Sequence, residues 1–226
     1  MKNFLSRVRR GFQCFKNRYF SWGYKLSKID NHVEIGVPVN VNPAFVKMEN
    51  FTRIHPDVKL ISAGYTVTIK KYSAISAGCL IIPGTHTPTV GVPQFLSILH
   101  VNDTGSGIVI DEDCWIGAES ALLHRCHIGR GCVVGARSVV TKEIPPYAVV
   151  AGTPARIVAT RFTLEQILEH ERILYPPEER LPMDKLRELF DGPYKGLKSL
   201  GTDEISESDL QTVKQKMTAL GIMSYQ

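Results

Sequence analysis

Six bulky aliphatic residues recur at every sixth position in the second half of the chain: Ile110, Ile116, Leu122, Ile128, Val134 and Val140. Neither regular secondary structure produces this spacing, because a helical face recurs every three or four residues and a strand face every two. A short strand followed by a turn, laid down three times per coil, does produce it. The period therefore predicts a mainly β fold, a hexapeptide parallel β-helix in which each coil buries its inward side chains by stacking on the next.

A small residue stands four positions after each of the first five aliphatics: Cys114, Ser120, Cys126, Cys132 and Ser138. Ile81, Ile75 and Ile69 carry the period backwards, but further upstream it breaks, since Asp57 would fall on an apolar position. We therefore expect about two regular coils on each side of a break, after an irregular first coil at residues 31–60. The break is a loop at residues 87–107, and a long loop inside a regular solenoid is usually functional.

The composition indicates a water-soluble chain in a reducing compartment. Its 226 residues contain no apolar run approaching the roughly twenty needed to cross a bilayer, and charges interrupt the N-terminal apolar residues, so no signal peptide is expected. Cys79, Cys114, Cys126 and Cys132 share the small inward slot of the repeat, and no Cys-x-x-Cys is present. These features favour buried, reduced thiols and a cytoplasmic protein, with no metal site predicted.

The basic residues concentrate in residues 1–30, which contain eight Lys or Arg and one acidic residue, Asp30. Apolar residues from Phe4 to Trp22 recur there at spacings of three and four, which predicts an amphipathic helix. The favoured interpretation is a cap over the open end of the solenoid. The alternative is a helix lying on the anionic inner face of the membrane. Nucleic acid is not expected as a partner, because no binding module accompanies the charge.

Three domains follow from these patterns: a basic helical segment at 1–30, the β-helix at 31–160 and a helical extension at 161–226. Within the extension, Thr163 and Gln166 form a capping box that opens a helix to about Tyr175. A second helix is expected over 183–190. A third is expected from Ser206 or Ser208 to Leu220, closed by Gly221.

His86 stands where the regular coil stops and the long loop leaves. A rigid solenoid can hold an imidazole there while the loop shapes a pocket around it, as a general base requires. We assign three other loop residues to the acceptor side of this pocket: Thr87, His100 and Asn102. A zinc enzyme on the same solenoid would need three converging histidines, and His124 and His127 are the only close pair in the sequence.

Three stretches together carry a family resemblance: DCWIGA at 113–118, VGARSVVTK at 134–142 and PPYAVVAGTPARIV at 145–158. They resemble the hexapeptide-repeat acyltransferases, in particular the maltose and galactoside O-acetyltransferase and xenobiotic acetyltransferase group, over roughly residues 60–160. The resemblance implies a left-handed parallel β-helix that forms a homotrimer. It also implies active sites at the subunit boundaries and acetyl-CoA in a groove along the coils of adjacent subunits.

On the matching positions, His86 is the implied catalytic base. The implied acetyl-CoA contacts are Trp115, Ala118, Gly135, Ala136, Thr141, Lys142 and Arg156. Lys142 and Arg156 also suit the phosphate end on chemical grounds, because cations pair with its negative charge. Trp115 has a second interpretation, as a packing residue between subunits.

The chain departs from this family's pattern at positions that concern the acceptor. Asp57-Val58-Lys59 replaces the Asn-Phe-Asn motif of maltose-type members, Ala159 replaces a second basic residue, and His86 is followed by Thr87 instead of proline. The segment at 161–167 resembles the tail of acetyltransferases of polysaccharide biosynthesis. We therefore predict direct acetyl transfer from acetyl-CoA to a hydroxyl of a sugar or polysaccharide precursor. The alternatives are N-acetylation of an amino sugar or antibiotic, and a non-catalytic trimeric scaffold.

Overall fold

The computed structural model describes residues 28–29, 32–36, 39, 43–61, 64–222 and 225. The helix predicted within residues 1–30 lies outside the described part of the chain, which includes only residues 28 and 29 of that segment. The chain divides into two compact units, residues 1–157 and residues 158–226.

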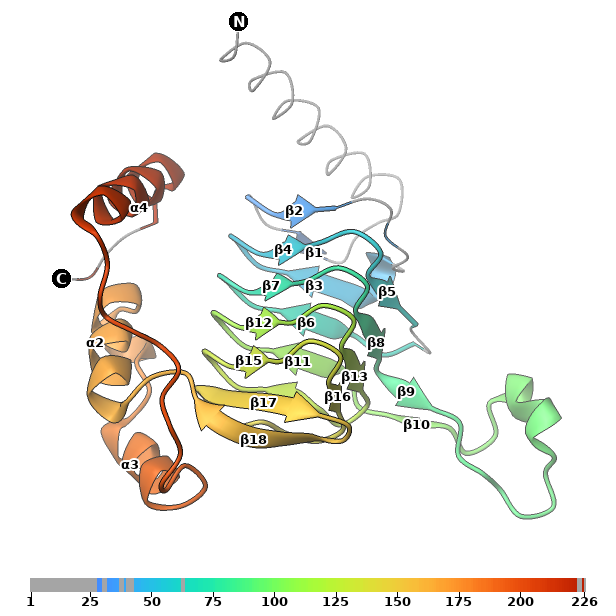
Figure 1. The fold of residues 1–226 in the computed structure, drawn as a ribbon. Coiled ribbons are helices and arrows are strands. Elements are labelled where there is room, and N and C mark those ends of the chain that lie inside the picture. Colours follow the sequence, from blue (N-terminus) through green and yellow to red (C-terminus); the bar gives the residue numbers. More distant parts are fainter. Residues whose placement is uncertain are drawn as a thin grey trace, which may run out of the picture. The chain divides into compact units, whose positions relative to one another are not determined.

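Most of the first unit is a stack of short strands, which belong to the sheets named here A, B and C (Figure 1). Sheet A contains β1 (Lys28–Ile29), β3 (Val46–Met48), β6 (Val67–Ile69), β11 (Ile108–Ile110) and β14 (His127–Ile128). Sheet B contains β2 (Glu34–Ile35), β4 (Arg53–Ile54), β7 (Ala74–Ile75), β12 (Trp115–Ile116), β15 (Val133–Val134), β17 (Ala148–Gly152) and β18 (Ala155–Thr160). Sheet C contains β5 (Lys59–Leu60), β8 (Leu80–Ile82), β13 (Ala121–Leu123) and β16 (Val139–Val140).

From β3 to β16 the strands of these three sheets follow one another in the order A, B, C, and after each C strand the backbone returns to A one layer further on. The strands pair in parallel from layer to layer, as Ile69 does with Ile110 and Ile110 with Ile128. This arrangement is the parallel β-helix that the six-residue period predicts.

The predicted inward residues form the core of the solenoid. Ile110, Ile116, Leu122, Ile128, Val134 and Val140 are all 0% exposed. The small residues of the adjacent slot are buried too, and the polar side-chain atoms of several of them bond to the backbone of a neighbouring layer. The Ser120 hydroxyl donates to the Gly135 carbonyl at 3.0 Å, and the Cys132 thiol donates to the Pro145 carbonyl at 3.0 Å.

Burial also keeps the inward thiols protonated. It raises the pKa of Cys126 to about 12, and it also raises the pKa of Cys114 well above the ordinary value of a thiol. A protonated, buried thiol is a poor nucleophile and a poor metal ligand, so the described cysteines have a packing role.

The prediction of an irregular coil over residues 31–60 is wrong for the second half of this range. Met48, Ile54 and Leu60 keep the six-residue spacing, are buried, and stack directly on Ile69, Ile75 and Ile81 of the next coil. Ile69, the first residue of the six-residue series in the next coil, stands nine positions after Leu60 in the sequence, which offsets the earlier coil by three positions. Asp57 therefore lies in an exposed turn with a positive φ of 64° and not at an apolar position.

The break in the repeat is an arm that projects from the solenoid between β8 and β11 (Figure 1). Its base is a two-stranded antiparallel ribbon of β9 (Gly84–Thr85) and β10 (Thr104–Gly105), and its outer part contains the 3₁₀ helix η2 (Gln94–Leu99). A short 3₁₀ helix, η1 (Pro43–Phe45), precedes β3.

The second unit contains the predicted helices. α2 (Leu164–Leu174) starts with the capping box of Thr163 and Gln166. η3 (Pro177–Glu179) and α3 (Met183–Asp191) follow, and α4 (Glu207–Leu220) runs from its N-cap Ser206 to Gly221 at φ 70°. Among the described residues, none of the helices has the length and apolar character to span a bilayer.

Candidate active site

The candidate site lies at the base of the arm, where the backbone pairing of β9 and β10 sets its geometry. In this ribbon Thr85 pairs with Thr104 and Gly84 with Gly105. Continuing the antiparallel register by one residue places His86 across from Asp103. The register of the ribbon therefore brings a histidine and a carboxylate together at the point where the arm leaves the solenoid.

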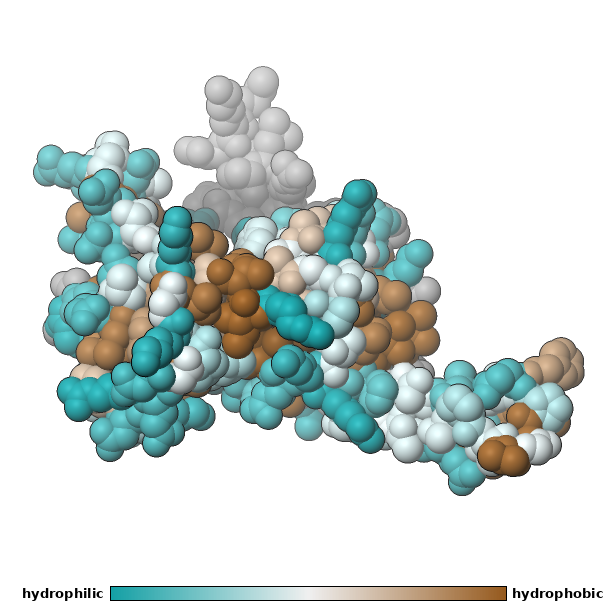
Figure 2. All heavy atoms as spheres, turned by 60° about the horizontal axis from the view of Figure 1, so that its bottom comes forward, coloured by the Kyte–Doolittle hydropathy of each residue, from teal (hydrophilic) through white to brown (hydrophobic). Residues whose placement is uncertain are grey.

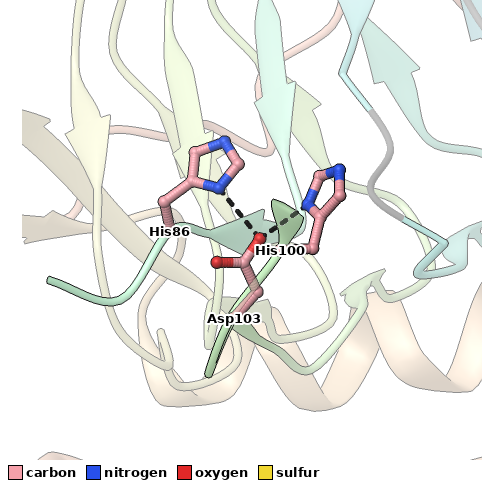
Figure 3. Close-up of side chains that lie close together, drawn as sticks. All are labelled: His86, His100 and Asp103. Carbon is pink, nitrogen blue, oxygen red and sulfur yellow. Dashed lines mark hydrogen bonds and ion pairs between the residues drawn. The ribbon is translucent and has the colours of Figure 1, made fainter. Parts of the chain in front are cut away.

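Two imidazoles share one oxygen of Asp103 (Figure 3). The Nδ1 atoms of His86 and His100 each lie 2.8 Å from Asp103 Oδ2, and the two rings stack with centroids 5.4 Å apart. His100 reaches Asp103 from three residues earlier in the chain because it ends η2 in the left-handed conformation, at φ 53°. The sequence-predicted residues His86 and His100 are thus neighbours in the structure.

The carboxylate is the enclosed member of this cluster. Its side chain is 14% exposed, whereas those of His86 and His100 are 49% and 60% exposed. The hydrogen bond from His100 lowers the pKa of Asp103, and the charge and hydrogen bond of His86 and the backbone N–H of Thr87 lower it further. Asp103 is therefore an ionised acceptor that orients both rings by their Nδ1 atoms.

The remaining predicted loop residues lie beside this cluster. A hollow within the arm is lined by His86 and Asp103 together with Thr87, Thr89, Val92 and Ser97. Asn102 is exposed, and its side-chain amide donates to the Thr89 hydroxyl at 3.2 Å, which ties the two sides of the arm together.

The residues implied for the pantetheine arm of acetyl-CoA gather at the corner between sheets B and C. Ala118 and Ala136 occupy this corner in successive layers, and the Arg137 N–H donates to the Ala118 carbonyl at 2.9 Å. The layers approach so closely that a Cβ on Gly117 would lie 2.6 Å from the Ala136 nitrogen. Gly135 precedes Ala136 in the same corner, so small residues follow one another from layer to layer at this position.

Trp115 lies just before this corner on the outer face of sheet B. It pairs with Ala74 on one side and Val133 on the other, and it is 48% exposed. A half-exposed indole between two apolar neighbours fits both interpretations of Trp115. It can line the acetyl-CoA groove, or it can pack against another subunit.

The implied phosphate-binding residues lie at the last layers of the first unit. Thr141 and Lys142 are exposed and directly follow β16. Arg156 is exposed on β18, where its Nη1 donates to the Ala155 carbonyl at 3.0 Å.

His86 and the small-residue corner lie at opposite ends of the strands of sheet C. His86 follows β8 and therefore lies near the corner between sheets C and A, whereas Ala118 and Ala136 precede β13 and β16. The parallel strands of one sheet carry their starts on one edge and their ends on the other. One chain thus does not bring the predicted base and the predicted acyl-carrier contacts to the same corner.

Asp103 is the member of this cluster that the sequence interpretation missed. The available signal was its spacing from His100, since a histidine and an aspartate three residues apart in a loop can share a hydrogen bond. Its pairing with His86 depends on the ribbon register, which the sequence does not display.

The far end of the arm is apolar and uncharged. Val90 is 102% exposed, Phe95 91%, Ile98 77% and Leu99 63%. Figure 2 shows hydrophobic side chains gathered at this end, away from the solenoid. A concentration of exposed apolar side chains of this kind is typical of a surface that another molecule covers.

Comparisons with known proteins agree with this fold. Residues 107–142, which include β11 to β16, match the family of bacterial transferase hexapeptide repeats, described as six repeats. The chain is 44% identical over 75 residues to a chloramphenicol acetyltransferase of Klebsiella aerogenes, which covers 33% of this chain and 36% of that protein. It is 40% identical over 69 residues to a 2,3,4,5-tetrahydropyridine-2,6-dicarboxylate N-acetyltransferase of Staphylococcus aureus strain JH9, covering 30% and 29% of the two chains.

A hexapeptide-repeat acetyltransferase of Vibrio cholerae has a similar solved structure, with a TM-score of 0.50 and 26% identity over 56% of this chain and 69% of that one. The chain aligns with only about a third of the length of the curated relatives it matches. The two sequence relatives and the structural relative all bear the name acetyltransferase. The coils of this chain thus carry the bacterial transferase hexapeptide repeat, and in both sequence and fold the chain is similar to the hexapeptide-repeat acetyltransferases.

Proposed function

We propose that this protein is an acetyltransferase that moves the acetyl group of acetyl-CoA to a hydroxyl of a sugar or polysaccharide precursor, with His86 as the general base. The observation that carries the proposal is the His86–Asp103 pair at 2.8 Å, at the base of an arm that interrupts a hexapeptide-repeat solenoid. The acetyltransferase names of the relatives support the reaction class. A structure of the Vibrio cholerae O1 biovar eltor relative holds acetyl-CoA.

In the proposed reaction, the Nδ1–H of His86 donates to Asp103, which leaves the lone pair of Nε2 for the acceptor. Nε2 takes the proton of the acceptor hydroxyl while its oxygen attacks the thioester carbonyl. The tetrahedral intermediate then collapses with cleavage of the C–S bond, and the CoA thiolate takes the proton back from His86. The ionised Asp103 stabilises the imidazolium that exists between these two transfers.

The proposed assembly is a homotrimer of left-handed β-helices with each site between two copies. The separation of His86 from the Ala118–Ala136 corner within one chain supports this assembly. In a trimer, a neighbouring copy can place its own Ala118–Ala136 corner beside the arm and so complete the site. The apolar outer residues of the lower coils, among them Trp115 and Val133, and the exposed Phe95 of the arm also call for a covering surface. Lys142 and Arg156 would bind the phosphate end of acetyl-CoA.

The test is release of free CoA from acetyl-CoA in the presence of a panel of nucleotide sugars, lipid-linked sugars and oligosaccharides. We expect release with at least one hydroxyl acceptor, and mass spectrometry should show one added acetyl ester. The ester should be absent with the His86→Ala variant. Failure of the protein to bind acetyl-CoA in calorimetry would overturn the proposal in favour of a non-catalytic scaffold.

The N-acetyl alternative uses the same base, because His86 can take a proton from an attacking amine as well as from a hydroxyl. The observation that favours including it is the similarity to an N-acetyltransferase over 69 residues. Amino sugars with a single free amine belong in the same panel, and an amide product resistant to mild alkali would assign the reaction to this class.

A further inference from the structure

We propose that His86, His100 and Asp103 form a binding site for a divalent transition metal of the Zn²⁺ type, and that the bound ion switches off the proposed acetyl transfer. Only the inhibition of acetyl transfer by the bound metal rests on the proposed function. The metal binding itself is inferred from the geometry of the arm.

The three ligand atoms already converge. Each residue offers one donor atom, and all three donors lie within 4.8 Å of one another. Because zinc binds imidazole nitrogen and carboxylate oxygen at about 2.1 Å, an ion can join donors that lie up to about 4 Å apart. The two half-exposed imidazoles can close the remaining distance by small side-chain rotations around Asp103.

The donor set selects the class of metal. Two imidazoles and one carboxylate suit Zn²⁺, Co²⁺ and Ni²⁺, whereas Mg²⁺ and Ca²⁺ prefer oxygen ligands. Three protein ligands with both rings open to solvent leave further coordination positions for water. The position of the ligands is set by the β9–β10 register and by the left-handed His100 that ends η2.

Metal binding and general-base catalysis need opposite states of the same ring. As the base, His86 carries its proton on Nδ1 and donates it to Asp103, with Nε2 free. As a ligand through Nδ1, it must carry the proton on Nε2 and give its Nδ1 lone pair to the metal. The ion also takes the carboxylate that orients the ring. Occupancy by the metal and proton transfer by His86 therefore exclude each other.

The binding test is calorimetric titration of the full chain, with any affinity tag removed, with Zn²⁺ and with Mg²⁺ as the comparison ion. Co²⁺ absorption in the visible range reports the ligand set independently. We expect one Zn²⁺ per chain and no saturable Mg²⁺ binding. Asp103→Asn and His100→Gln, which nearly keep the size of each side chain, should each weaken Zn²⁺ binding by at least about tenfold. The matched control is His124→Ala, which removes a histidine outside the cluster and should leave the affinity unchanged.

Absence of saturable Zn²⁺ binding by the wild-type chain would overturn the proposal, as would unchanged affinity in both ligand variants. Circular dichroism checks that both variants are folded. If either Asp103→Asn or His100→Gln fails to fold, the other variant still tests the site.

The activity test compares each variant with its own metal-free rate. Zn²⁺ should inhibit the wild type with a midpoint near its calorimetric Kd, a chelator should reverse the inhibition, and the ligand variants should resist it. Zn²⁺ bound through these residues without loss of rate would overturn the switch. Zn²⁺ binding in a chain with no acetyl transfer at all would instead count against the proposed function.

Discussion

The Nδ1 atom of His86 and the Oδ2 atom of Asp103 lie 2.8 Å apart at the base of the arm, on the two segments that β9 and β10 join. This hydrogen bond fixes the plane of the imidazole and directs Nε2 away from the carboxylate. The same carboxylate oxygen accepts from His100, so one acidic residue organises both rings.

Replacing His86 with alanine should lower the rate of acetyl transfer by at least about a hundredfold, because a positioned base contributes a factor of about that size. The side chain is 49% exposed, so the free energy of unfolding should change little. Initial rates and a urea unfolding curve measure the two quantities. His124→Ala serves as the control, and near-normal turnover of the His86 variant would remove this residue from its assigned role.

Asp103→Asn should reduce kcat by about tenfold or more with little change in the KM of either substrate, since Asp103 acts through His86 and not on the substrate. Asp103→Glu keeps the charge and should restore part of the lost kcat. A purely structural role of Asp103 predicts a different result, in which Glu and Asn variants are equally inactive and less stable. Steady-state kinetics on the three proteins distinguish these outcomes.

Lys142→Ala and Arg156→Ala should each raise the KM for acetyl-CoA by about three- to tenfold, with smaller effects on kcat, because a lost charge-assisted bond to phosphate weakens binding in the ground state and the transition state alike. Lys185→Ala removes an exposed cation from the second unit and is the matched control. The assignment of Lys142 and Arg156 is wrong if their variants show the KM of the control.

Gly131→Ala should destabilise the solenoid by about 3 kcal/mol, through a left-handed backbone and overpacking together. Its φ is 70°, and a Cβ would lie 2.5 Å from the ring of Tyr147, which is 0% exposed. Gly64 is the matched comparison, because its φ is 88° but no atom of the residues that the structure describes lies within 4 Å of its Cβ position. Gly64→Ala should therefore cost only about 1 kcal/mol. Chemical unfolding measures both, and equal costs would show that the contact with Tyr147 adds nothing.

The stability of the solenoid should fall as the pH rises above about 9, where an unfolded thiol ionises. Burial raises the pKa of Cys126 from 9.0 to about 12, so only the unfolded chain loses this proton between those values, and ionisation favours unfolding. Each such thiol contributes up to about 1.4 kcal/mol per pH unit.

The measurement compares urea unfolding free energies at about pH 8 and about pH 10. Cys126→Ser is a suitable control, because Ser120 and Ser138 occupy the equivalent slot and are buried. A serine does not ionise in this range, so the variant should lose less stability on the same change of pH. An identical pH dependence in the two proteins would contradict the assignment.

Local patterns were sufficient for the regular parts of the molecule. An inward aliphatic residue recurs at every sixth position, so residues such as Ile116 and Val134 identify the coil without any knowledge of its neighbours. The capping box at Thr163 and the glycine at 221 likewise bound helices through contacts within one turn. His86 was identifiable as a candidate because it stands at the boundary between the periodic coil and the loop.

What the amino-acid sequence determined by itself is therefore the coil, its core and the place where it is interrupted, because these depend on the spacing of side chains along a few residues. Only the tertiary structure decided the offset between Leu60 and Ile69 and the pairing of Asp103 with His86. The length of a turn is not encoded in the period of the strands that it joins. The partner of a side chain across a ribbon depends on backbone register, which forms only when the two strands meet.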